Sequence, residues 1–417
     1  MTIRIAERVR QLKPSVTVAV ANRAKQMVRE GVDVLQFTLG EPDFDTPQRI
    51  KDAAIKAMQA GETKYMPTLG DPETRKVVAD KLTNENKIPG LTPEHVAISS
   101  GGKHTLFVLL HCLVDPPAPG EQAAEAIIPV PAWVSYRPIC EMAGAEVREI
   151  PTGPETSFKI SPEQLREAIN PRSRVLFLNS PSNPCGTMYS ESELRALAKV
   201  VHETRDIAPD LVVITDEIYE KIVYGGIDHF SIGSVPEIAE RTVTVNGLSK
   251  AFAMTGWRVG YCGCPGEAGA ALIKAMGTLQ GQMTTNITSF NYAATRCALT
   301  ECAEEVEQMR RAFAERAVVI QDRLAEIPGM VMPKCTGAFY AFPDVSAHFG
   351  KKSPEGREIN AALEFSEALL LEAKTAVIPG EDFGGCGKNH IRISFACSTD
   401  QIHRGMDRLR DFVASLR

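Results

Sequence analysis

The sequence lacks any long hydrophobic run: nowhere do about eighteen apolar residues follow one another, the minimum for a bilayer-spanning helix. It also lacks an excess of positive charge, since the net charge of its 417 residues is -6. These two absences argue against a membrane-spanning protein and against a nucleic-acid-binding surface. The N-terminal residues alternate charged and apolar side chains and show no secretory signal, so we expect a cytoplasmic protein.

The spacings that disulfide frameworks and metal sites need are missing as well. The ten cysteines are spread from Cys112 to Cys397 without a framework, which is typical of reduced, buried thiols. The eight histidines form no HExxH motif, and we interpret His104 and His111, which lie on an apolar stretch, as packing residues. We therefore expect no metal site in a chain whose length allows about two to three globular domains.

Short runs rich in β-branched residues alternate with stretches of helical periodicity, such as residues 190–203. This alternation predicts an α/β domain with a mostly parallel sheet. Ligands of such sheets bind beyond the carboxyl ends of the strands, and here each run ends in a polar cluster. The predicted strands are residues 96–100, 125–130, 174–179, 211–215 and 242–246.

The last third of the chain predicts a second, smaller domain. Residues 301–327 have the apolar periodicity of one long helix, which a Pro-Gly pair ends. A strand at 337–342, a helix at 360–374 and a strand at 392–396 are expected before a final helix. We expect the N-terminal segment to pack with this part of the chain.

The first two strand ends carry features that suit a planar, phosphorylated ligand. Gly101 and Gly102 place bare backbone N–H groups at a helix start, which favours phosphate, although two glycines also form ordinary turns. Trp133 lies at the second strand end, where its ring either stacks on a planar ligand or packs in the core. Neither feature alone separates the two alternatives.

The next two strand ends carry polar side chains whose partners the sequence leaves open. Asn183 lies between two prolines that fix the backbone, so its amide either makes a specific hydrogen bond or supports a turn. Asp216 follows an apolar strand, and a carboxylate there needs a partner, either a ligand or a structural cation. Tyr219, three residues on, reaches the same side of a turn.

Lys250 follows the last predicted strand, in the stretch GLSKAFAMTGWR. A lysine surrounded by apolar groups favours the neutral, nucleophilic amine that a Schiff base with an aldehyde needs. Ser249 and Arg258 offer a hydroxyl and a guanidinium to an anionic group such as phosphate. With Asp216 for a pyridinium nitrogen and Trp133 for stacking, the set describes a site for pyridoxal 5′-phosphate.

The order of these motifs resembles the class I aminotransferases of fold type I, in particular the bacterial aspartate and prephenate aminotransferase subgroup. The resemblance covers almost the whole chain and includes GEPDFDTP, SSGGKH, PAWVSY, NSPSNPCG, TDEIYE and IRISFA. It implies a large domain, residues 48–295, with a mostly parallel seven-stranded sheet flanked by helices. It also implies a smaller α+β domain formed by residues 1–47 and 296–417, and a homodimer with shared active sites.

The resemblance implies roles for individual residues. Lys250 resembles the catalytic lysine that forms the Schiff base, and Asp216 resembles the catalytic partner of the pyridine nitrogen. Tyr219, the third predicted catalytic residue, and Asn183 match residues that hydrogen-bond the phenolic oxygen of the cofactor. Trp133 matches the ring stacked on it. The predicted phosphate ligands are Gly102, Lys103, Ser249, Arg258 and, from the neighbouring subunit, Tyr65.

The resemblance extends to the substrate. Arg392 resembles the arginine whose two-pronged guanidinium binds the α-carboxylate, and Gly40 resembles a glycine whose backbone approaches the substrate. Lys103 matches a lysine for a distal carboxylate, which favours aspartate and glutamate. In relatives that act on prephenate, a threonine in the segment that contains Lys13 and Thr17 and the lysine that Lys103 matches are associated with that substrate. Thr17 could equally cap a helix. The remaining predicted substrate-binding residues are Trp133 and Asn183.

These residues predict a ping-pong aminotransferase that moves the amino group of L-aspartate or L-glutamate to a 2-oxo acid such as 2-oxoglutarate. Prephenate is a second candidate acceptor. Two alternatives stay open, an aminotransferase for aromatic or other amino acids and a C–S β-lyase, because fold and cofactor do not set the reaction type. A regulator that only senses the cofactor lacks support, since no DNA-binding segment is visible.

Overall fold

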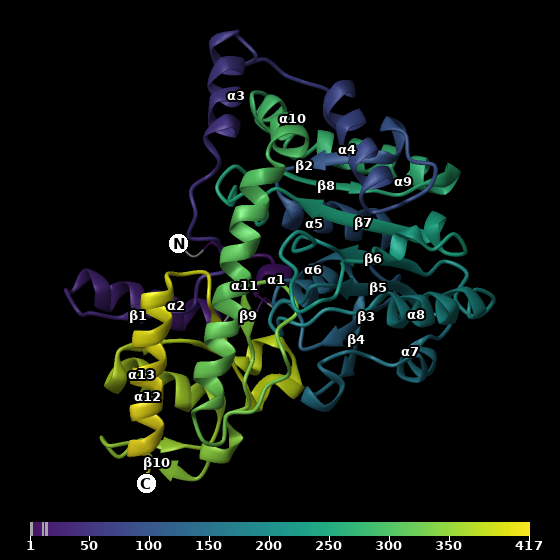
Figure 1. Ribbon diagram of the computed structural model, residues 1–417. Coiled ribbons are helices and arrows are strands. Elements are labelled where there is room, and N and C mark those ends of the chain that lie inside the picture. The colour runs from purple at the N-terminus through teal and green to yellow at the C-terminus, as the bar shows by residue number, and fades with distance from the viewer. Residues whose placement is uncertain (1–2, 11, 13–15) are drawn as a thin grey trace.

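The computed structural model describes residues 3–10, 12 and 16–417 (Figure 1). The strands of its main sheet are β2 (Val96–Ser99), β3 (Glu125–Val130), β4 (Glu146–Pro151), β5 (Ser173–Asn179), β6 (Val212–Asp216), β7 (Thr242–Gly247) and β8 (Gly260–Gly263). Their order is β2-β8-β7-β6-β5-β3-β4, and only the pairs that include β8 are antiparallel. The predicted α/β class and the mostly parallel seven-stranded sheet are confirmed.

Helices cover both faces of this sheet. Along β5, Val175 and Phe177 point to one face and Leu176 and Leu178 to the other, and all four are buried. A strand buried on both faces carries apolar residues at successive positions, so such strands read as continuous apolar runs. The first face packs against α5 (Gly102–Leu113), α6 (Tyr136–Ala143) and α9 (Gly266–Gly281), and the second against α7 (Pro162–Ala168) and α8 (Glu191–Glu203).

The five predicted strands are confirmed as β2, β3, β5, β6 and β7, each to within one residue at either end. The sequence did not predict β4 or β8. β4 lies at the sheet edge with alternate side chains exposed, so it carries charged residues and no apolar run. β8 contains Gly260, where a Cβ would overlap the backbone of Gly102. The close approach of two backbones, and not β-propensity, therefore determines this strand.

A second hydrophobic core lies beside the sheet. It is built around α11 (Ala303–Ala325), α12 (Ala362–Ala373), α13 (Thr399–Ser415), β9 (Tyr340–Ala341) and β14 (Ile391–Ser394). Figure 1 shows α11, in green, running from the region of the sheet to α13, against which it packs. The two cores therefore meet along the carboxyl ends of the central strands.

The predicted elements of this region are confirmed with one adjustment. The helix predicted at 301–327 is α11, and Cys302 separates it from α10 (Asn291–Glu301). The predictions for residues 360–374 and 392–396 correspond to α12 and β14 to within two residues. The strand predicted at 337–342 is reduced to β9, because Ala338 has a positive φ of 55° that interrupts extended backbone.

The N-terminal segment packs with this second core, as expected. β1 (Leu35–Gln36) pairs in parallel with β12 (Thr375–Ala376), and side chains of α2 (Val16–Arg29) are buried against Leu370. The division into domains 48–295 and 1–47 with 296–417 stays a prediction. The other elements are α1 (Glu7–Arg10), α3 (Gln48–Gln59), α4 (Pro72–Asn84), β10 (Lys351–Lys352), β11 (Glu358–Ile359) and β13 (Ile378–Pro379).

The cysteines behave as the sequence predicts. All ten are free thiols, and all are buried except Cys112 and Cys386, which are half-buried. Burial raises the pKa of the Cys112 thiol to about 11, which disfavours its reactive thiolate. Among the described helices, none has both the length and the hydrophobicity that crossing a bilayer requires.

Gly186 and Gly226 provide a matched test of backbone packing, since their φ angles are 69° and 80°. A Cβ at Gly186 would overlap the carbonyl oxygen of Tyr340, whereas a Cβ at Gly226 meets nothing within 4 Å. We expect Gly226→Ala to lower the free energy of unfolding by about 1 kcal/mol, the cost of the left-handed conformation. Gly186→Ala should lower it by about 2 to 4 kcal/mol, because β9 must also move. Denaturant unfolding measures both, and equal losses would contradict the role of this contact.

Candidate active site

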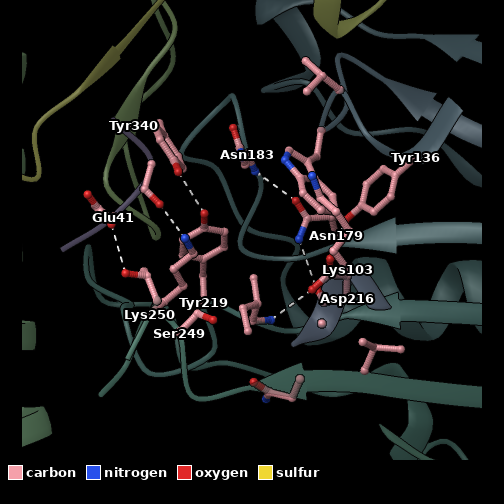
Figure 2. A pocket seen from close by; sticks show the side chains of 18 of the residues that line it. Glu41, Lys103, Tyr136, Asn179, Asn183, Asp216, Tyr219, Ser249, Lys250 and Tyr340 are labelled. Atoms are coloured by element: carbon pink, nitrogen blue, oxygen red, sulfur yellow. Dashed lines mark hydrogen bonds between the residues drawn. The ribbon is translucent and has the colours of Figure 1, made fainter. Parts of the chain in front are cut away.

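The carboxyl ends of the central strands open into one cavity of about 470 Å³ between the two cores. Figure 2 shows how its side chains converge from strand ends, from the N-terminal segment near Glu41 and from β9. Sequence-predicted site residues make up about half of its lining. They are Gly40, Gly102, Lys103, Trp133, Asn183, Asp216, Tyr219, Ser249, Lys250, Arg258 and Arg392.

Three predicted site residues are not part of this lining. Tyr65 is 89% exposed and lies outside the cavity of its own chain, so its contact with a neighbouring subunit stays a prediction. Lys13 lies outside the described residues. Thr17 belongs to α2, but its side chain is not among those described. The predicted roles of Lys13 and Thr17 toward prephenate therefore stay predictions.

Lys250 lies in the wall of the cavity and is half-buried. Its amine donates a hydrogen bond to the carbonyl oxygen of Gly40 and lies 5.9 Å from the ring centroid of Tyr219. Burial lowers the pKa of Lys250 to about 8; Glu41 opposes this shift, and the Arg392 cation adds to it. A much larger fraction of this amine is therefore in the neutral, nucleophilic form near neutral pH than for an ordinary lysine.

Asp216 is the last residue of β6 and is buried beneath the cavity. Its carboxylate accepts hydrogen bonds from the Tyr136 hydroxyl at 2.7 Å and from the Ile218 backbone N–H at 3.2 Å. Burial raises the pKa of Asp216, whereas these two bonds lower it. A carboxylate held in this way suits a protonated ring nitrogen, because such a partner offsets the cost of the buried charge.

The end of the cavity nearest α5 is built to hold an anion. α5 begins at Gly102, and a Cβ there would meet no atom within 4 Å, so space is open in front of the helix N-terminus. The guanidinium of Arg258 lies against Gly101 and donates to the Thr255 carbonyl oxygen at 2.9 Å. A helix N-terminus and a guanidinium at one point match a phosphate group.

Arg392 provides a second, separate cation. Its Nη1 donates to the Asn183 side-chain oxygen at 3.0 Å and its Nη2 to the Thr38 carbonyl oxygen at 2.9 Å. Its Nε is buried without a partner. Burial lowers the pKa of Arg392, so its charge is held at a cost that an anionic ligand would offset.

Lys103 and Trp133 form another part of the cavity wall. The Lys103 amine lies over the Trp133 ring, 5.0 Å from its centroid. Burial lowers the pKa of Lys103, and the nearby Arg258 cation lowers it further. Lys103 is thus a third cation in the cavity whose neighbours leave it free to pair with a ligand.

Sequence reasoning missed several residues that line the cavity. Asn179 ends β5 beside Asp216 in the parallel register, and its amide donates to the Asp216 carbonyl oxygen at 2.9 Å. Its side-chain oxygen accepts from the Asn183 backbone N–H at 2.9 Å. Its position as the last residue of an apolar run was the available signal. The other missed residues include Glu41, Tyr136, Thr255 and Tyr340.

The turn after β6 is anchored from behind the cavity. Glu217 and Glu220 alternate with Asp216 and Tyr219 and point the opposite way, where Asn86 donates to them at 2.8 and 2.7 Å. Burial raises the pKa of Glu217 to about 8. Burial acts on Glu220 in the same direction, but the basic groups around it, Lys81 above all and then His229 and Lys221, together outweigh burial and hold the pKa of Glu220 at about 2.

The comparisons with known proteins agree with this geometry. The sequence matches the family described as aminotransferase class I and II over residues 32–409. The chain belongs to this family. The aspartate aminotransferase of Geobacillus stearothermophilus is 40% identical over 99% of both chains, and the aspartate/prephenate aminotransferase of Cereibacter sphaeroides is 39% identical over 99% of both. The crystal structure of the Rhizobium meliloti aspartate aminotransferase covers 100% of both chains with a TM-score of 0.93 at 34% identity.

The predicted resemblance to aminotransferases of fold type I is therefore confirmed. Class I and II aminotransferases depend on pyridoxal phosphate and act on amino acids and 2-oxo acids. The cavity fits that cofactor, since it offers an amine for an aldehyde, a buried carboxylate for a ring nitrogen and a cationic helix N-terminus for a phosphate. The aminotransferase reaction predicted from the sequence agrees with this membership.

The low pKa of Lys250 is directly measurable in the cofactor-free aminotransferase. We expect the rate of Lys250 acetylation, followed by peptide mass spectrometry, to reach half its maximum near pH 8, because only the neutral amine reacts. In the protein unfolded in denaturant, the same lysine should reach half its maximum near about pH 10.4, the ordinary value. Identical profiles in the folded and unfolded protein would show that burial does not activate this amine.

Proposed function

We propose that this aminotransferase moves the amino group of L-aspartate or L-glutamate to a 2-oxo acid by a ping-pong reaction with pyridoxal 5′-phosphate. The observation that carries the proposal is the pair of cations, Arg392 and Lys103, in the cavity of Lys250. In the described part of the chain, neither cation forms an ion pair with a carboxylate. Two cations without protein counter-ions in one cavity suit a substrate with two carboxylates.

Arg392 is proposed to bind the α-carboxylate and Lys103 the distal one. A guanidinium offers two parallel N–H groups to two carboxylate oxygens, and Asn183 and Thr38 fix its plane from behind. The single ammonium of Lys103 suits the more mobile end of the substrate. The buried Nε of Arg392, which has no protein partner, supports a ligand at this point.

When bound, pyridoxal phosphate supplies an aldehyde for the amino group and a ring that accepts the electrons released at the α-carbon. Lys250 would hold the aldehyde carbon, and Asp216 would keep a proton on the ring nitrogen. Tyr219 would donate its hydroxyl proton to the phenolic oxygen, as would the amide nitrogen of Asn183, whose oxygen already accepts from Arg392. The proposed phosphate ligands are Gly102, Lys103, Ser249 and Arg258.

Lys250 is also the proposed acid and base for the proton at the α-carbon. With substrate bound, the Lys250 amine would remain in the cavity wall, where it could take up and return the proton of the substrate α-carbon. A base works best when its pKa lies near the operating pH, and burial brings that of Lys250 to about 8. The aromatic wall of Tyr219 and Phe339 limits the access of water to this amine.

Prephenate is proposed as a second acceptor. Several relatives of similar identity are named aspartate/prephenate aminotransferases. Lys103, one of the residues associated with this substrate, lines the cavity. We also propose a homodimer in which the exposed Tyr65 reaches the phosphate site of the partner.

The direct test is a visible-absorbance titration of the holoenzyme with L-aspartate. We expect aspartate to remove the band of the lysine-bound cofactor, and oxaloacetate and prephenate, in separate cuvettes, to restore it. Restoration by oxaloacetate alone would confine the enzyme to aspartate chemistry. A band that does not respond to aspartate would refute the proposed donor, and pyruvate release from cystathionine would then indicate a β-lyase.

Lys103→Ser tests the distal carboxylate site. We expect kcat/KM for aspartate to fall by about 10- to 100-fold, the loss of one charge-assisted hydrogen bond. The same constant for alanine, which has no distal carboxylate, should fall much less. Lys274→Ser, an exposed substitution on α9, is the matched control and should change neither constant. Equal losses for aspartate and alanine would remove Lys103 from this role.

A further inference from the structure

Tyr340 contacts two residues of the cavity that have different proposed roles (Figure 2). Its hydroxyl oxygen lies 2.9 Å from that of Tyr219, and the centroid of its ring lies 4.7 Å from the central guanidinium carbon of Arg392. The side chain is buried on β9, which pairs with β14, the strand of Arg392. One short, rigid side chain therefore joins the proposed carboxylate ligand to the proposed donor for the phenolic oxygen.

The charges on either side of the hydroxyl pair determine which hydroxyl donates. The Arg392 cation lies against the Tyr340 ring and makes its phenol a stronger donor. Arg392 also lowers the pKa of Tyr219, but there Tyr340 and the Asp216 carboxylate oppose it. Burial raises the pKa of both phenols, and that of Tyr219 is raised further. Either hydroxyl can donate in this bond, and the contact of the Arg392 cation with the Tyr340 ring favours Tyr340 as the donor. With Tyr340 as the donor, the proton of Tyr219 is left for an acceptor in the cavity.

We propose that Tyr340 is a positioning residue for transamination: its ring holds the guanidinium of Arg392 in place, and its hydroxyl turns the proton of Tyr219 toward the cavity. This inference rests on the proposed function, because it takes Arg392 and Tyr219 in the roles given above. Tyr340 has one further constraint, since a Cβ at Gly186 would overlap its carbonyl oxygen. Its backbone is thus fixed from the opposite side.

A spectroscopic consequence follows from the chain of hydroxyls. A hydroxyl that accepts a hydrogen bond becomes a better donor, so Tyr340 strengthens the bond from Tyr219 to the phenolic oxygen. That bond favours the deprotonated form of the lysine-bound cofactor. The visible absorbance band reports the protonation state of the lysine-bound cofactor, and its pH midpoint is the pH at which half of the cofactor is deprotonated. Loss of the Tyr340 hydroxyl should raise this midpoint. The charged and titratable groups that face Tyr219 are Tyr136, Tyr340, Arg392, Asp216 and Lys250.

Two substitutions in the holoenzyme separate the hydroxyl from the ring. Tyr340→Phe should raise the pH midpoint of the visible band by at least about 0.3 unit and leave the dissociation constant of succinate, an unreactive dicarboxylate, unchanged. Tyr340→Leu should raise the midpoint by the same amount. It should also raise the dissociation constant of succinate by about 3- to 10-fold, because the cation–π contact with Arg392 is lost. An unchanged midpoint in Tyr340→Phe would overturn the proposal.

Two controls exclude a merely structural effect. Tyr224 is a buried tyrosine whose hydroxyl donates to the Ala338 carbonyl oxygen, in the same segment as Tyr340, and it does not line the cavity. Tyr224→Phe should leave the midpoint at the wild-type value, and a shift equal to that of Tyr340→Phe would overturn the proposal. In a Tyr219→Phe background, Tyr340→Phe should cause no further shift, since Tyr340 acts through Tyr219.

Failure of this inference and failure of the proposed function give different results. Measuring the pH midpoint of the visible band and the dissociation constant of succinate requires bound cofactor but no turnover. A holoenzyme that does not react with aspartate would refute the proposed donor, and its midpoint would still show whether the Tyr340 hydroxyl acts on the cofactor. A holoenzyme that reacts with aspartate, but whose midpoint is the same in wild type and Tyr340→Phe, would refute the inference alone.

Discussion

Burial of the Lys250 amine is the physical constraint around which the site is arranged. A primary amine is charged in water and unreactive toward an aldehyde, so it must be held where its charge is costly. The end of β7 provides this place, with the Gly40 carbonyl and the rings of Tyr219 and Phe339 around the amine. The same position, at the carboxyl edge of a parallel sheet, also collects polar groups from the neighbouring strands.

The turn from Asp216 to Glu220 places functional side chains in the cavity and anchoring side chains on the opposite side. Asp216 and Tyr219 face the cavity, while Glu217 and Glu220 are buried on the other side with Asn86 and Lys81. Glu217, Glu220 and a nitrogen of His229 lie within 4.8 Å of one another, a spacing that also suits a metal. Lys81 already provides a cation at this point, so the cluster is best explained as an anchor that fixes the turn.

The sequence predicted the central strands and about half of the cavity residues because both depend on local signals. An apolar run that ends in a polar residue marks the strand and its functional end together, as with Asp216. Tyr136 and Tyr340 lack such a signal. Tyr136 bonds Asp216 from a helix 80 residues earlier in the chain, and Tyr340 reaches Tyr219 across 121 residues. The first contact is set by how α6 packs on the main sheet and the second by how the two cores meet, and no local pattern records either.

The cavity lining includes four basic side chains, Lys103, Lys250, Arg258 and Arg392, but only two acidic ones, Glu41 and Asp216. This excess of positive charge affects both ligand binding and the pKa of Lys250. It attracts anions, which suits a phosphorylated cofactor and a dicarboxylate. Arg392 and Arg258 also act with burial to lower the pKa of Lys250, against the opposing effects of Glu41 and Asp216. Anions bound at the two arginines would offset their repulsion, so the Lys250 amine would become more basic once its ligands are present. The amine is thus most nucleophilic in the empty cavity and a stronger proton acceptor in the filled one.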